Sequence, residues 1–111
     1  MTARLHCFGE SGNAYKVALM LSVAGQDWQP RYVDFFNGEA RGEAFRKLNP
    51  MGEVPVLVDG VEVLTQSGNI LYHLVGKTGR FGGSTPAAQK EVWRWVLWDN
   101  HKLSGQAGTC R

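Results

Sequence analysis

The chain has 111 residues, of which 43% are hydrophobic and 11% aromatic, and it carries a formal net charge of +2 at pH 7. This composition suits one ordinary domain, or a small domain with part of another, and is too apolar for a disordered chain. The basic residues are scattered along the sequence and form no block, so we expect no nucleic-acid partner.

The cysteines and histidines predict neither a redox centre nor a metal site. Cys7 and Cys110 lie near opposite ends and form no CxxC pattern or disulfide framework. His6, His73 and His101 lack the spacing of metal ligands, so we expect no metal. The first ten residues hold no apolar run long enough for a signal peptide, and no segment is long enough to span a bilayer. We therefore expect a cytoplasmic protein.

The first third of the chain predicts a strand, a helix and a second strand. Arg4–Phe8 is a short apolar-rich run, typical of a strand. Asn13–Ala24 has the apolar period of a helix, and Gly25 supplies a stop. Trp28–Phe36 is predicted as a second strand. Pro30 favours the edge of the sheet for this strand, because proline cannot donate a ladder hydrogen bond.

The middle of the chain predicts a short helix, a hairpin and a longer helix. Glu43–Leu48 is expected to be helical and to end at Asn49-Pro50. Two β-branched runs then flank Asp59-Gly60, a dipeptide typical of a type I′ hairpin turn. The next helix is expected over residues 69–77, with Ser67 as its N-cap. Its predicted buried face carries Ile70, Leu71 and Leu74.

The end of the chain predicts a linker and one more helix. Residues 79–85 are glycine-rich, and Pro86 suits the first position of a helix capped by Thr85. The element order β-α-β-(α)-β-β-α, followed by a lone helix, indicates an α/β protein with a four-stranded mixed sheet. The pattern predicts the thioredoxin-like fold. The last helix has an aromatic face, formed by Trp93, Trp95 and Trp98, that needs a partner.

Three stretches resemble the glutathione transferase family in the right order and at the right spacing. They are "LNPMGEVPVLVDGVEVLTQSGNILYHL" (Leu48–Leu74), "SGNAYKVALML" (Ser11–Leu21) and the start of "VWRWVLWDNHKLSG". The resemblance covers nearly the whole chain. The sequence is similar to bacterial theta-, zeta- or beta-like members with a serine in the active-site loop. It implies a glutathione-binding thioredoxin-like domain over residues 1–78 and a linker over 79–85. Residues 86–111 would then hold the first helix of an incomplete all-helical domain.

The resemblance implies binding roles for four residues. It implies that Pro55 is cis and that the backbone N–H and C=O of Val54 pair with the cysteinyl part of glutathione. It implies that Ser67 and the helix N-terminus behind it hold the γ-glutamyl carboxylate, a place where unpaired N–H groups favour an anion. Gln66 stands where the family commonly has an acidic residue for the ligand's ammonium group, so we expect weaker selectivity for that group.

Two positions depart from the family pattern. Ala40 stands where some classes have a histidine for the glycyl carboxylate, and Arg41 beside it would supply the same charge. The alternative is that Arg41 is a solvated surface residue. Glu53 stands where a basic residue or Gln is common. A carboxylate there would repel the glycyl carboxylate unless it points away.

The resemblance also implies a residue that activates the thiol of glutathione. Ser11 lies between the first strand and the first helix and is our candidate donor to the thiolate; the alternative is that it only caps the helix. Asn13 is the rival donor, and Tyr15 is less favoured because it lies inside the helix. Cys7 is expected to be a small core residue without a redox role.

The expected function is that of a glutathione S-transferase that joins glutathione to a small electrophile or uses it to reduce a peroxide or a disulfide. Two other classes remain open: a non-catalytic or truncated glutathione-binding module, and an interaction protein with a degenerate site. The missing helical domain is the feature that distinguishes the transferase from the binding module. We expect a longer parent chain or a short form that covers its aromatic helix by oligomerising, and a homodimer as the assembly.

Overall fold

The computed structural model describes residues 2–9, 11–34 and 37–99. A sheet of four strands and a set of helices follow one another along this part of the chain. In order they are β1 (Ala3–Cys7), α1 (Gly12–Val23), β2 (Trp28–Tyr32), the 3₁₀ helix η2 (Glu39–Arg41), α2 (Glu43–Leu48), β3 (Val56–Asp59), β4 (Glu62–Thr65), α3 (Ser67–Thr78) and α4 (Pro86–Trp98). The predicted βαβ-ββα order is confirmed.

The sheet is mixed, as the element order predicted. Its strand order is β2-β1-β3-β4, with β1 parallel to β2 and antiparallel to β3, and β3 antiparallel to β4. Pro30 lies in β2, which is an edge strand, so the prediction from its missing N–H is confirmed. This is the thioredoxin-like architecture.

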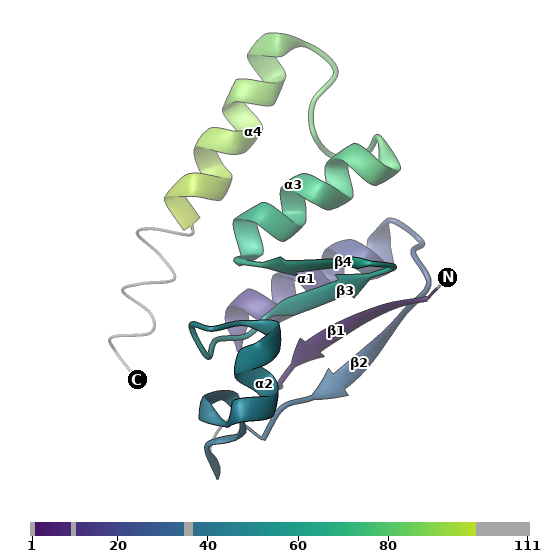
Figure 1. Ribbon diagram of the computed structural model, residues 1–111. Coiled ribbons are helices and arrows are strands. Elements are labelled where there is room, and N and C mark those ends of the chain that lie inside the picture. The colour runs from purple at the N-terminus through teal and green to yellow at the C-terminus, as the bar shows by residue number, and fades with distance from the viewer. Residues whose placement is uncertain (1, 10, 35–36, 100–111) are drawn as a thin grey trace.

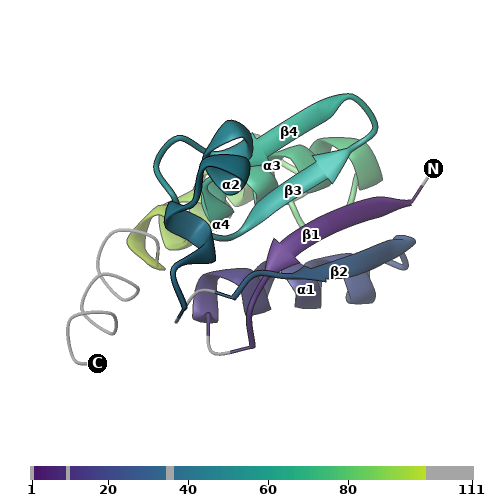
Figure 2. The ribbon, with the colours of Figure 1, turned by 60° about the horizontal axis from the view of Figure 1, so that its bottom comes forward.

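Helices α1 and α3 cover one face of the sheet and α2 covers the other (Figures 1 and 2). The period-2 alternation of the strands sends Leu5 and Leu57 toward α1 and α3, where both are fully buried. Burying one such side chain stabilises the fold by roughly 1.5–3 kcal/mol. The main core therefore lies between the sheet and these two helices. Its members are Ala3, Leu5, Val17, Leu21, Leu57, Ile70 and Leu74.

A second, smaller core fixes α2 and η2 on the opposite face. It contains Val33, Ala40, Phe45 and Val56. Phe45 also meets His6 of β1 edge to face, with ring centroids 6.2 Å apart. Because Ala40 is one of these buried residues, η2 is held against the segment that leads into β3.

The second strand is shorter than predicted. It ends at Tyr32, because the chain turns at Asp34 instead of continuing. The Asp34 N–H donates to Glu39 Oε1 at 2.7 Å, and the Asp34 carboxylate accepts from Asn37 Nδ2 at 2.9 and 3.0 Å. The last two residues of the predicted strand, 35 and 36, lie outside the described residues.

The predicted type I′ turn at Asp59-Gly60 is wrong by one residue. Asp59 pairs with Glu62, so the two loop residues are Gly60 and Val61. Gly60 has φ +65, and Val61 is not among the residues with positive φ. Positive φ at the first loop position alone is the pattern of a type II′ turn. Asp59 is therefore the last residue of β3 and not part of the turn.

Helix α4 begins as predicted but leaves its aromatic face largely open. Pro86 is its first residue, and the Thr85 hydroxyl accepts from the Ala88 N–H at 3.1 Å. Trp93 meets Tyr72 of α3, and Asp99 forms an ion pair with Lys16 of α1. Three other apolar side chains remain about half exposed or more: Trp95, Leu97 and Trp98. No helix in the described part of the chain is long and apolar enough to cross a membrane.

Candidate functional site

The strand register brings three separate stretches of the chain to one end of the sheet. His6 of β1 pairs with Val56 of β3, and Val56 pairs with Thr65 of β4. Beyond this row the chain runs from β1 toward Ser11, backward from β3 to Val54 and Pro55, and from β4 into Gln66 and Ser67. Ser11, Val54–Pro55 and Gln66–Ser67 therefore gather at this end of the sheet. Arg41 lies in η2, and Glu53 lies in the loop before β3.

Ser11 caps α1. Its N–H donates to the Phe8 carbonyl at 3.1 Å, which folds the loop back onto the end of β1. Its hydroxyl oxygen accepts from the Ala14 N–H at 3.1 Å, and the residue is 8% exposed. A hydroxyl has one donor and two acceptor positions, so this cap leaves the O–H proton to donate elsewhere. Capping and donation to a ligand are compatible at Ser11.

The other candidates around Ser11 differ in exposure. Asn13 is partly buried in the first turn of α1 and takes part in an interaction of its own. The Tyr15 side chain is 64% exposed on the surface of the helix. Cys7 is half-buried against the main core, and burial raises the pKa of its thiol. A raised thiol pKa disfavours the reactive thiolate and agrees with a packing role.

The Val54–Pro55 peptide bond is cis, as expected from the family resemblance. Pro55 is buried, and the pairing of β3 with β1 starts only at Val56, so the Val54 backbone lies outside the ladder. The loop before it is held by Asn49, which is 3% exposed. The Asn49 amide donates to the Glu53 carbonyl at 2.9 Å and accepts from the Met51 N–H at 3.1 Å.

Gln66, not Ser67, is the N-cap of α3, so the prediction that Ser67 caps this helix is wrong. The Gln66 carbonyl already accepts the first helical hydrogen bond, from the Ile70 N–H at 2.9 Å. Ser67 is the first helical residue and is 3% exposed. Gln66 has φ +70, a strained value for a residue with a side chain, and its amide lies 3.7 Å from the Met51 sulfur. Strain of this kind gathers at ligand-binding positions.

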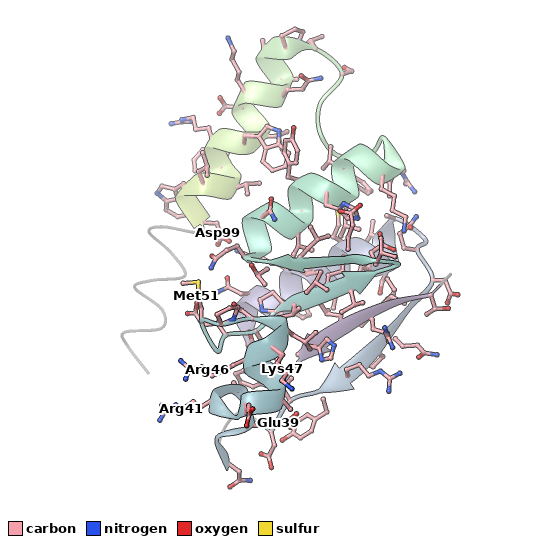
Figure 3. All side chains as sticks on the ribbon, in the orientation of Figure 1. Glu39, Arg41, Arg46, Lys47, Met51 and Asp99 are labelled. Carbon is pink, nitrogen blue, oxygen red and sulfur yellow. The ribbon has the colours of Figure 1, made fainter. Side chains whose placement is uncertain are left out.

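The charged residues near this end of the sheet are exposed. Figure 3 shows Arg41 and Arg46 pointing outward on the side of the molecule where Met51 lies. Arg46 Nε donates to the Pro50 carbonyl at 3.3 Å, and Glu53 is exposed. Within residues 2–9, 11–34 and 37–99, no three His, Cys, Asp or Glu side chains are arranged to hold a metal ion.

Comparison with known proteins identifies the family. Residues 1–76 match the family model for the glutathione S-transferase N-terminal domain. The chain belongs to the glutathione S-transferase family. It is 40% identical over 74 residues to glutathione S-transferase 1 from Dianthus caryophyllus, a match that covers 67% of this chain and 34% of the relative.

A second group of relatives includes a transcriptional regulator. The chain is 43% identical over 104 residues to the transcriptional regulator URE2 from Saccharomyces cerevisiae, covering 86% of this chain and 28% of that protein. Its structure also resembles Ure2p in complex with glutathione, with a TM-score of 0.88, 28% identity and coverage of 96% of this chain and 52% of that one. The chain thus spans about a quarter to a half of the length of these relatives.

Three features of this glutathione S-transferase domain were not found from the sequence. They are the buried amide of Asn49 that holds the loop, the strained backbone of Gln66, and the close approach of Gly52 to Ala40. A Cβ on Gly52 would lie 2.8 Å from the Ala40 oxygen. The Asn-Pro and Gly of the "NPMGEVP" motif were the available signals, because an Asn in a turn commonly bonds the backbone two residues on.

Proposed function

We propose that this domain binds glutathione at the end of the sheet, where Ser11, Val54–Pro55 and Gln66–Ser67 lie, and holds its thiol as a thiolate. The observation that supports this most is the register that places the three segments side by side, at row His6–Val56–Thr65. Membership of the glutathione S-transferase family supports the same assignment.

The cysteinyl backbone of glutathione would extend the sheet next to Val54. The free backbone groups of an exposed strand end can pair with an extended peptide, which is a common recognition mode. Val54 precedes the paired part of β3 and is only partly buried. Its N–H and C=O would therefore orient the ligand and leave the cysteinyl side chain free to approach α1.

The γ-glutamyl end would lie on the N-terminus of α3. This helix has 12 residues, and its first N–H groups carry the positive end of the helix dipole. The α-carboxylate would bind these groups and Ser67, and the α-ammonium would face the amide oxygen of Gln66. At the other end, Arg41 is proposed for the glycyl carboxylate. Glu53 is exposed, which leaves its carboxylate free to turn away from the ligand.

Ser11 is proposed to donate to the sulfur. A free thiol has a pKa of roughly 8.5, so only about 3% is ionised at pH 7. A shift of about 2 units makes the thiolate the main species, which requires roughly 2.7 kcal/mol. One hydrogen bond to a charged group contributes about 1.5–3 kcal/mol. One serine at the start of α1 is therefore nearly sufficient, and Asn13 remains the rival donor.

The proposed reaction is attack of the thiolate on a small electrophile, or reduction of a peroxide or disulfide by glutathione. We assign residues 1–78 to the glutathione domain, 79–85 to the linker and 86–111 to the start of a helical domain. The exposed tryptophans of α4, Trp95 and Trp98, support such a continuation or a homodimer. A pocket for the electrophile would be completed by those additional contacts.

A binding module without turnover is the second candidate function. The similarity to URE2, which is described as a transcriptional regulator, favours it. The partial coverage of the longer relatives favours it as well, since groups outside these 111 residues could be required for turnover.

Two measurements on the same protein separate these candidates. Titration calorimetry with glutathione tests binding, and conjugation of glutathione to a generic aromatic electrophile tests turnover. The transferase proposal expects both signals, with turnover reduced in Ser11→Ala. Binding without turnover would favour the module, and absence of binding would exclude both.

A further inference from the structure

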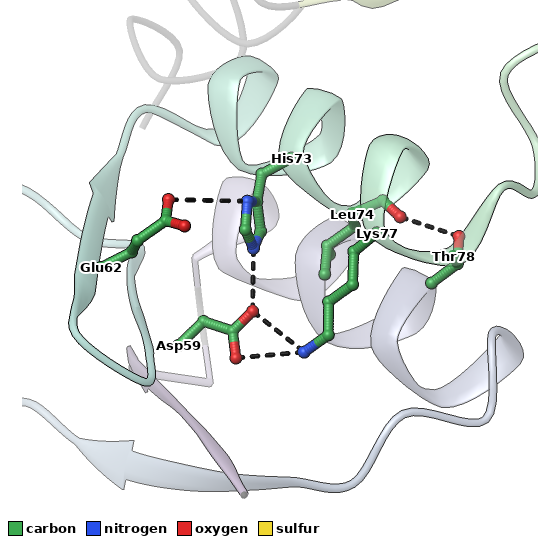
Figure 4. A network of polar contacts seen from close by, with 6 residues as sticks. All are labelled: Asp59, Glu62, His73, Leu74, Lys77 and Thr78. Atoms are coloured by element: carbon green, nitrogen blue, oxygen red, sulfur yellow. Dashed lines mark hydrogen bonds and ion pairs between the residues drawn. The ribbon is translucent and has the colours of Figure 1, made fainter.

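A polar cluster joins the β3–β4 hairpin to α3, at the end of the hairpin that is far from Val54. Figure 4 shows its members, Asp59, Glu62, His73 and Lys77. The Oδ2 atom of Asp59 lies 2.8 Å from His73 Nε2, and Lys77 Nζ lies 3.0 and 3.1 Å from the two carboxylate oxygens. The second ring nitrogen, His73 Nδ1, lies 3.9 Å from Glu62 Oε2. One imidazole thus stands between two carboxylates.

The placement of the cluster follows from the periods of strand and helix. Asp59 has the same strand parity as Leu57, which is buried under the helices, so its side chain points toward α3. Glu62 is the direct cross-strand partner of Asp59. His73 and Lys77 are four residues apart and therefore lie on the same face of α3.

The charge balance of the cluster depends on the imidazole. With His73 neutral, two carboxylates face a single ammonium group. With His73 protonated, two positive groups balance two negative ones. A neutral imidazole donates from one nitrogen only, whereas an imidazolium donates from both. The contact with Glu62 therefore becomes an attraction between opposite charges only when the ring is protonated.

We propose that His73 is a pH-responsive brace, whose protonation tightens the attachment of α3 to the β3–β4 hairpin. The side chains of His73 and Asp59 are only 20% and 13% exposed, so solvent and salt screen their interaction incompletely. The Lys77 and Glu62 side chains are 38% and 60% exposed and contribute less. The brace lies at the end of the hairpin far from Val54 and goes beyond the proposed function.

The ionisation of Asp59 keeps the brace intact on mild acidification. The hydrogen bond from His73 is the main cause that lowers the Asp59 pKa, and Lys77 adds to it against the effect of burial. Asp59 therefore stays charged on mild acidification. In stronger acid the carboxylate takes up a proton and its contribution is lost.

His6 provides a matched control on the other face of the sheet. Burial is the main cause that lowers its pKa, followed by the charges of Arg4 and Arg31, with Glu39 acting against them. A lowered histidine pKa means that protonation destabilises the fold, so this contribution falls as the pH drops below about 6.5. The two histidines should therefore act in opposite directions.

The test is urea unfolding of the full chain at pH 8 and pH 6 for wild type, His73→Gln, Glu62→Gln and His6→Gln. The ratio of the folding equilibrium constant of wild type to that of His73→Gln should rise about two- to fivefold from pH 8 to pH 6, as expected for a partly exposed ion pair. The same ratio against His6→Gln should fall. An equal or smaller ratio for His73→Gln at pH 6 would overturn the proposal.

Glu62→Gln keeps the test decisive if His73→Gln does not fold. Its side chain is 60% exposed, so its replacement removes charge without opening the core. The loss of stability in Glu62→Gln should be larger at pH 6 than at pH 8, because the imidazolium is then its partner. A loss that is the same at both pH values would contradict the brace.

Discussion

Gly52 lies directly against the backbone of Ala40. A Cβ built on Gly52 would stand 2.8 Å from the Ala40 carbonyl oxygen, and Gly52 has φ +66. This contact locks η2, and with it Arg41, onto the loop that enters β3 at Pro55. The glycine is required by two independent conditions, a positive φ and a close approach to backbone.

Replacing Gly52 by alanine is expected to lower the free energy of unfolding by about 2–4 kcal/mol. Left-handed backbone contributes roughly 1–2 kcal/mol of this and the clash the rest. Gly38→Ala is the control, because Gly38 has φ +86 with nothing within 4 Å of its Cβ position. Urea unfolding measures both losses. Equal losses would show that the approach to Ala40 has no structural weight.

Ser11→Ala and Thr85→Ala form a matched pair of cap removals. Each hydroxyl accepts from a helix N–H at 3.1 Å, at the start of α1 and of α4. Each substitution is expected to lower stability by about 1 kcal/mol. Only Ser11→Ala should raise the pKa of the bound glutathione thiol, by about 1–2 units. Ultraviolet titration of the thiolate measures that shift; a similar pKa in the two variants would remove Ser11 from the chemistry.

Gln66→Glu is expected to bind glutathione about two- to tenfold more tightly. The added carboxylate turns a neutral contact with the ligand's α-ammonium into an ion pair, which contributes about 0.5–1.5 kcal/mol. Calorimetry measures the change, and a glutathione analogue without the α-amino group is the control. The analogue should gain nothing. Weaker binding of glutathione by Gln66→Glu would contradict the assignment of the γ-glutamyl end.

Asp59→Asn tests the acid stability that the polar cluster provides. Because the pKa of Asp59 is lowered, chiefly by the hydrogen bond from His73, its charge stabilises the fold above its ordinary pKa. This contribution is lost as the pH falls through the lowered value, below about pH 4. Wild type should thus exceed Asp59→Asn in stability near neutral pH and approach it in strong acid. Acid unfolding curves that stay parallel would count against the lowered pKa.

Most of the fold could be predicted because its signals are local. The helix stripe around Val17 and Leu21, the missing N–H of Pro30 and the cap at Thr85 each act within a few residues. The structure confirms the three predictions made from these signals. The resemblance added the cis bond at Pro55, because this bond depends on the family and not on local propensity.

The features that were missed depend on contacts between distant residues or on competition between similar turns. The turn forms at Gly60–Val61 and not at Asp59-Gly60, because Asp59 pairs across the hairpin and its carboxylate contacts His73 and Lys77 of α3. The cap of α3 moved to Gln66, whose strained φ no propensity favours. The contact between Gly52 and Ala40 joins residues 12 apart through a close approach of backbone that the sequence does not display.

The most direct test of the central claim is a titration of the isotope-labelled chain with glutathione, followed by amide chemical shifts in NMR. Binding at the proposed site should give saturable shifts at Ser11, Val54, Gln66 and Ser67 and little change at the hairpin turn, Gly60 and Val61. S-hexylglutathione should compete for the same amides. Shifts that do not saturate, or that cluster away from the end of the sheet at Ser11, Val54 and Gln66, would contradict a glutathione site there.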